Sequence, residues 1–142
     1  AYLYMGNQDY DTALDYLNAI LNLKADNLRE DIQNYAQLLS LMAHFELGNY
    51  QLMEYQVGKA KRFMSKTKEL NAVQQKTLRF FKSIIRLPQA EQMAQFVKFR
   101  EEIKKLENDR FAIRDFIYLD VPAWIDSKIE KKPMAEIIKN RL

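Results

Sequence analysis

Hydrophobic residues recur along the chain at spacings of three and four, the spacing that gives an α-helix one apolar face. In segment 10–23 the apolar positions are Tyr10, Ala13, Leu14, Leu17, Ile20 and Leu21. The same periodicity predicts helices over 30–47, 50–65, 72–87 and 88–106, with further short helices between 107 and 142. No stretch of five or more residues alternates convincingly between apolar and polar, so the pattern predicts an all-α fold. The short connections predict antiparallel neighbours.

The residues between these segments are typical of helix ends. Asp9 and Asn49 are expected to cap the helices that follow them, because short polar side chains accept hydrogen bonds from free backbone N–H groups. Gly48 is expected to end the helix over 30–47, since glycine adopts the left-handed conformation that stops a helix. Pro88 and Pro133 are expected at the starts of later helices, where a missing N–H costs nothing.

Two parts of the chain, 5–20 and 45–60, share the order of their turn and apolar residues. Each has Gly-Asn, then tyrosine, then apolar residues at fixed intervals. Setting Tyr10 against Tyr50 aligns the positions that follow: Ala13 with Met53, Leu17 with Val57, and Ile20 with Ala60. Such repetition is typical of stacked helix pairs, because one pair alone cannot bury its apolar face.

This pattern resembles the tetratricopeptide repeat, a helix pair with glycine at its turn and an aromatic residue opening its second helix. The matching residues are Tyr4, Tyr10 and Ala13 in the first copy and Gly48, Tyr50 and Ala60 in the second. The copies depart from the family because Met53 replaces a small residue and because they lie 40 residues apart rather than about 34. The resemblance covers 1–65, and 70–106 more loosely.

The resemblance implies a right-handed superhelical array over 1–106, closed by C-terminal helices over 107–142. The C-terminal segment 119–142 also resembles the ends of bacterial tetratricopeptide-like proteins of unassigned function, which implies a non-catalytic module that binds or scaffolds other proteins. A length of 142 residues fits one such domain. Because Ala1 already lies in a predicted helix, we expect the chain to be a piece of a longer protein.

In the family, the first helix of each pair faces the concave side of the array. The residues that this geometry assigns to a protein-binding groove are Tyr35, Leu38, Met42 and Phe45. The other apolar positions of 30–47 serve the repeat core, so this helix has to be covered on both sides. The groove has two candidate occupants: a peptide of a partner protein, or the chain's own helices over 121–142.

Charge is distributed unevenly along the chain, although the net charge is only +3. Residues 1–48 carry two basic residues against seven acids, and residues 59–86 carry nine against one. Helical spacing gathers a basic patch of Lys59, Arg62, Lys66, Lys76, Arg79, Lys82 and Arg86. It is either an ordinary solvated surface or a site for nucleic-acid phosphate, an acidic peptide or an anionic membrane.

The sequence carries none of the common short motifs of catalysis or cofactor binding. The sequence contains no phosphate-binding loop, no dinucleotide motif and no nucleophile elbow. Its one histidine, His44, cannot supply a two-histidine metal site and is expected to pack in the fold. The lack of cysteine excludes disulfides and thiolate zinc sites and favours a reducing, cytoplasmic setting.

No apolar run approaches the roughly 20 residues of a membrane span, so no transmembrane segment is expected. Because the sequence lacks these catalytic and cofactor motifs, we predict no enzyme activity and no cofactor. A protein or peptide is the leading partner, and nucleic acid or another anion bound through 59–86 is the alternative. An active site shared with a partner chain is a third, weaker hypothesis.

Overall fold

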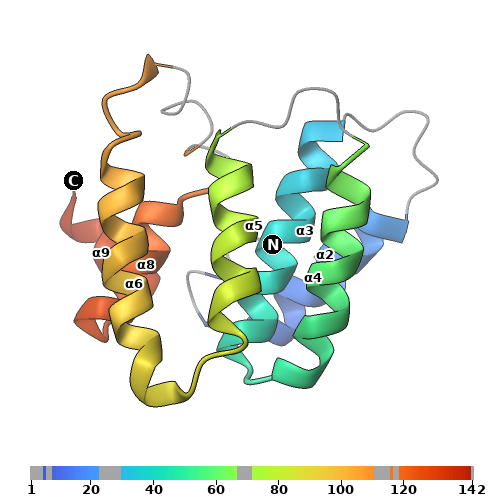
Figure 1. Ribbon diagram of the computed structural model, residues 1–142, viewed down its shortest axis with the longest axis horizontal. Coiled ribbons are helices and arrows are strands. Elements are labelled where there is room, and N and C mark those ends of the chain that lie inside the picture. Colours follow the sequence, from blue (N-terminus) through green and yellow to red (C-terminus); the bar gives the residue numbers. More distant parts are fainter. Residues whose placement is uncertain are drawn as a thin grey trace.

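The structure, a computed structural model, describes residues 5, 8–22, 30–66, 72–110, 116 and 119–141. This part of the chain contains α-helices and no strand, so the all-α prediction is confirmed (Figure 1). The helices are α2 (Tyr10–Asn22), α3 (Glu30–Glu46), α4 (Tyr50–Met64), α5 (Ala72–Ile84), α6 (Gln89–Lys104), α8 (Val121–Glu130) and α9 (Met134–Asn140). Tyr4 and Leu23, which the predicted repeat and first helix include, lie outside the described residues.

The helices form two groups that meet at α5. α3 packs against α2, α4 and α5, while α6 packs mainly against α8, and α8 in turn contacts α9. In Figure 1, α5 stands between the group of α2, α3 and α4 and the group of α6, α8 and α9. The C-terminal helices α8 and α9 therefore lie at one end of the molecule and are held chiefly through α6.

Most helix ends agree with the predictions from sequence. Asp9 Oδ1 accepts a hydrogen bond from Thr12 N at 3.3 Å, which confirms the predicted cap of α2. Gly48 has φ of +75°, the left-handed conformation expected where α3 ends. Pro88 and Pro133 each stand immediately before the first helical residue of α6 and α9.

The predicted cap of α4 by the Asn49 side chain is wrong. The Asn49 backbone N–H donates to the His44 carbonyl at 3.0 Å, which places its side chain beside the last turn of α3. There the side-chain N–H of Asn49 donates to Nδ1 of His44 at 3.3 Å, and it makes no capping hydrogen bond. The glycine turn thus ties Asn49 back to the helix before it.

A cluster of aromatic rings joins the two groups of helices. Its members are Phe45 from α3, Phe80 and Phe81 from α5, Phe96 and Phe99 from α6, and Trp124 from α8. Trp124 is 1% exposed, and its ring centroid lies 5.3 Å from that of Phe96 and 5.4 Å from that of Phe81. Aromatic pairs at such separations add stability beyond the area they bury. The C-terminal helices are therefore part of the core.

Candidate functional site

The apolar stripe predicted to form a protein-binding groove lies inside the core. Its residues are all less than a tenth exposed: Tyr35 6%, Leu38 0%, Met42 1% and Phe45 4%. The ring of Trp124 lies 5.9 Å from that of Phe45, with the planes nearly perpendicular. Helix α8 of the same chain thus covers the end of the stripe, and the side chains of Tyr35, Leu38 and Met42 are closed to a partner in this structure.

A groove that does reach solvent lies beside the turn between α3 and α4, and we call it the turn groove. Its volume is about 510 Å³, and its apolar lining comprises Phe45, Leu47, Tyr50, Met93 and Phe96. Phe45 and Phe96 are buried, with ring centroids 5.7 Å apart. Leu47, Tyr50 and Met93 are 36%, 43% and 38% exposed. The groove therefore combines a rigid aromatic floor with accessible apolar walls.

One side of the turn groove is basic. Lys128 and Lys131, at the end of α8, line it together with Glu46. The Glu46 carboxylate accepts a hydrogen bond from Trp124 Nε1 at 2.9 Å and pairs with Lys128 Nζ at 3.0 Å. Lys131 is exposed and forms no ion pair in the described part of the chain. The Lys131 ammonium is thus the free charge at the rim.

Glu46 also faces the start of α2. Burial, together with the Glu46 carboxylate, raises the pKa of Tyr10 to about 12, so this phenol stays neutral over the physiological range. Sequence patterns did not single out Glu46, since a lone acid at a helix end carries no motif. Its role arises from contacts with residues about 80 positions later in the chain.

The predicted basic patch is accessible. Six of its residues are exposed and Lys76 is partly buried. Exposed Lys61 adds to the patch, because its side chain on α4 lies close enough to Lys82 on α5 to affect the pKa of that ammonium group. We call these eight residues the basic face. None of the eight forms an ion pair in the described part of the chain. Lys61 was missed because helical spacing assigned it to neither stripe.

The basic face is strained electrostatically at the junction of α4 and α5. The close approach of Lys61, and then the positive charge of Arg86, lower the pKa of Lys82. Like charges so close favour release of a proton or binding of an anion.

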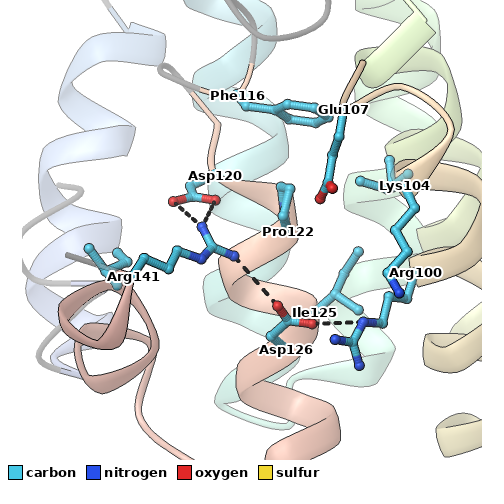
Figure 2. Close-up of a pocket in the computed structure, with 11 residues that line it drawn as sticks. Arg100, Lys104, Glu107, Phe116, Asp120, Pro122, Ile125, Asp126 and Arg141 are labelled. Atoms are coloured by element: carbon cyan, nitrogen blue, oxygen red, sulfur yellow. Dashed lines mark hydrogen bonds and ion pairs between the residues drawn. The ribbon is translucent and has the colours of Figure 1, made fainter. Parts of the chain in front are cut away.

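A cavity of about 840 Å³ lies between α6, α8 and α9 (Figure 2). Ile103 and Ile125 form part of its buried apolar lining, and charged side chains surround them. The described lining residues include no histidine, serine or threonine, and the carboxylates of Asp120 and Asp126 are paired with arginine side chains.

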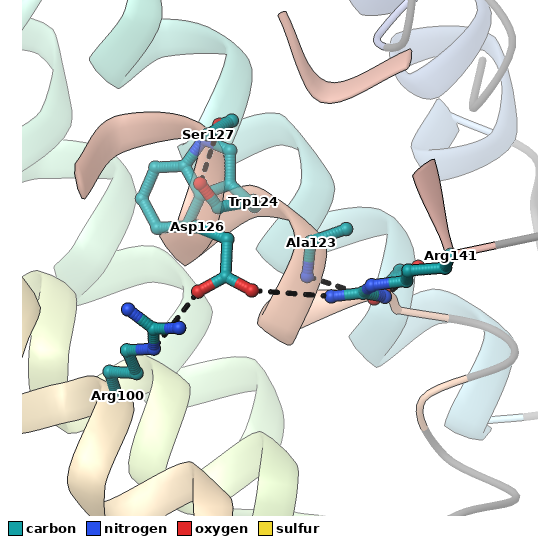
Figure 3. Close-up of polar contacts among 7 residues, drawn as sticks. Arg100, Ala123, Trp124, Asp126, Ser127 and Arg141 are labelled. Carbon is teal, nitrogen blue, oxygen red and sulfur yellow. Dashed lines mark hydrogen bonds and ion pairs between the residues drawn. The ribbon is translucent and has the colours of Figure 1, made fainter. Parts of the chain in front are cut away.

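The charged groups of this cavity mainly pair with one another (Figure 3). Asp126 Oδ1 lies 3.0 Å from Arg100 Nε, and its Oδ2 lies 3.5 Å from Arg141 Nη2. Arg141 also contacts Asp120 Oδ1 at 3.3 Å, and the same oxygen accepts the Ala123 N–H at 3.0 Å. The network connects α6, α8 and the residue after α9, so it holds the C-terminal helices together.

His44 is 8% exposed and lies outside these cavities. Burial lowers the pKa of its imidazole, so the neutral form that accepts the hydrogen bond from Asn49 is favoured. Within the described ranges, no cluster of three or more histidine, aspartate or glutamate residues is arranged to hold a metal ion.

Comparison with known proteins adds no assignment: no protein-family model, no curated protein and no solved structure matches the chain. In the described portion of the chain, no helix combines the length and apolar character needed to cross a membrane.

Proposed function

We propose that the chain is a non-catalytic protein-interaction module of tetratricopeptide-like helical-repeat type. The packing of α3 supports this proposal, because α3 contacts both α4, its partner in a helix pair, and α5, the first helix of the next pair. The glycine turn between α3 and α4 supports it as well. The third pair departs from a regular array, since α6 packs mainly on α8.

The turn groove is the observation that carries the proposed function. Single exposed apolar side chains are common, but Leu47, Tyr50 and Met93 gather around one hollow above buried aromatic rings. Binding energy in protein interfaces concentrates where an anchor side chain enters such a pocket. An apolar side chain of a partner peptide would replace water between Tyr50 and Met93.

The partner's chemistry follows from the charge at the rim. Because Glu46 is already held by Trp124 and Lys128, the unpaired Lys131 gives this side of the groove a net positive charge. A peptide that presents a large apolar side chain close to an acidic one fits both features. The proposed partner is therefore a protein segment of apolar and acidic character.

The proposal is tested with a pair of charge-insertion variants. The variant Leu47→Glu with Met93→Glu places acids in the groove, and Tyr16→Glu with Tyr55→Glu places them on surfaces 52% and 62% exposed outside it. Immobilised wild type and variants are compared for proteins retained from a nuclease-treated lysate of the source cells. The proposal expects a retained protein that the groove variant loses and the control keeps. Equal retention by both variants, or equal loss from both, contradicts it.

A further inference from the structure

The basic face differs from the turn groove because it offers charge without an apolar anchor. The exposed large apolar side chains of α4 are Tyr50, Leu52 and Tyr55, and all three come before Lys59, the first basic residue of that helix. Helix α5 exposes no large apolar side chain. Phe80 and Phe81 of α5 are buried in the core. Acidic side chains are also scarce. Helix α4 contains one acidic residue, Glu54, and helix α5 contains none. The surface is thus almost purely cationic.

The charges converge where α4 meets α5. Helix α4 packs on α5, which brings Lys61 beside Lys82, and Arg86 is close enough for its charge to act on Lys82. Such an arrangement has no internal counter-charge, because none of the eight cations is paired within the described residues. A phosphate oxygen accepts hydrogen bonds from several cations at once and would relieve this repulsion.

A small cleft lies between α5 and α6. Its lining includes Lys76 and Arg79 from α5 and Lys98 and Glu102 from α6. No ion pair joins either basic residue to Glu102, so this acid does not neutralise the edge of the face. The cationic surface therefore continues from α4 across α5 to the border of α6. From Lys59 to Lys66 the cations extend over about 10 Å along the end of α4, which is about the length of three phosphates of one strand.

We propose that the basic face binds the phosphate backbone of double-stranded nucleic acid without sequence preference. A protein partner is less suited to it, because protein interfaces depend on aromatic and apolar anchors. Peripheral membrane helices insert a row of apolar side chains beside their cations. On α4 and α5 the exposed large apolar side chains nearest the cations are Leu52 and Tyr55, and α5 exposes none. Proteins that bind single strands stack successive bases on accessible aromatic rings, whereas Phe80 and Phe81 are in the core and Tyr55 is the exposed ring beside Lys59.

Binding through phosphates has a measurable dependence on salt. If roughly half of the eight cations meet phosphates, the logarithm of affinity falls with a slope of about −3.6 against the logarithm of salt concentration. Between about 50 and 200 mM salt, affinity then falls roughly 100-fold. Two duplexes of unrelated sequence should give the same affinity and the same slope, since backbone contacts carry no sequence information.

The test uses fluorescence anisotropy with two labelled DNA duplexes of unrelated sequence, each of about 20 base pairs, or two helical turns. The face variant carries Lys61→Glu, Lys82→Glu and Arg86→Glu. The control carries Lys104→Glu, Lys105→Glu and Lys139→Glu, which are exposed residues outside the face. Because both triple variants change net charge equally, a difference between them reports position rather than total charge. A milder face variant with glutamine at the same three positions guards against misfolding, which circular dichroism monitors.

We expect the wild type to bind both duplexes equally at low salt, with a negative salt slope as large as that given above. The face variant should lose about tenfold or more in affinity and the glutamine variant several-fold, whereas the control should change by less than about threefold. Absence of binding at low salt, or an equal loss in the control, overturns the proposal. Preference for polyglutamate or phosphatidylserine vesicles over both duplexes also overturns it. None of these outcomes bears on the turn groove.

Discussion

Replacing Trp124 with alanine should detach the C-terminal helices from the rest of the core. The indole is 1% exposed and contacts rings from three other helices, including Phe45 of α3 and Phe96 of α6. Substitutions of buried large aromatic residues by alanine cost about 3–5 kcal/mol, the larger values where the cavity cannot collapse. Rings fixed on separate helices relax poorly, so we expect a value in the upper part of this range.

The magnitude converts to a shift in melting temperature. In a domain of this size, about 4 kcal/mol lowers Tm by roughly 10 °C. The conservative variant Trp124→Phe retains most of the packing but removes the N–H that donates to Glu46 at 2.9 Å. Since Lys128 still pairs with Glu46, we expect this variant to lose only about 1–2 kcal/mol.

Calorimetry or urea unfolding measures these differences, with Val97→Ala as the control, because Val97 is 46% exposed. That substitution should change stability by about 0.5 kcal/mol or less. Trp124→Ala should also bind a hydrophobic dye in its native state, because the rings of Phe45 and Phe96 lose their cover. A loss below about 1 kcal/mol with no dye binding would refute the assignment of α8 to the core.

Three further predictions concern titration and charge. Burial lowers the pKa of His44 from its usual 6.5, so as the pH falls His44 binds a proton in the unfolded chain before it does in the folded protein. Stability should therefore fall as the pH drops below 6.5. His44→Phe should weaken this dependence in urea-unfolding midpoints; an unchanged dependence would place its origin elsewhere. The Tyr10 pKa, raised from 10.0 to about 12, means that the unfolded chain loses this proton first, so stability should fall between these pH values. Ultraviolet titration of the tyrosines compares the wild type with Tyr10→Phe. If the variant lacks a tyrosine that titrates near pH 10 in the wild type, the raised pKa of Tyr10 is contradicted. Asp126→Asn breaks the contacts with Arg100 and Arg141 and should cost about 1 kcal/mol, less in molar salt; a salt-independent loss would argue against the ion pairs.

Sequence patterns predicted the helices well because their signals are local. Apolar spacing placed α2 to α6, and the conformational freedom of Gly48 located the end of α3. The capping role of Asn49 failed because its competitor, the ring of His44, comes from the preceding helix, and the turn brings the two together. Local propensity alone does not rank two such hydrogen bonds.

The candidate sites were harder to predict because they depend on how helices pack. Periodicity marked Phe45 as a face to be covered, but only the structure shows the ring of Trp124 against it. The turn groove combines Tyr50 with Met93, two residues whose proximity no sequence motif signals. The basic face could be predicted in outline, since a run of cations is visible in the sequence, whereas the contact of Lys61 with Lys82 required the packing of α4 on α5.

The measurement that most directly tests the proposed interaction is site-specific photo-crosslinking from the turn groove. A photoreactive amino acid replaces Met93 in one variant and Tyr16, on α2 and outside the groove, in another. Both are irradiated in the source cells, and the adducts are identified by mass spectrometry. The proposed function predicts a discrete adduct with one protein from position 93, joined through a segment of apolar and acidic residues, and none from position 16. The same adducts from both positions, or none from position 93, would contradict it.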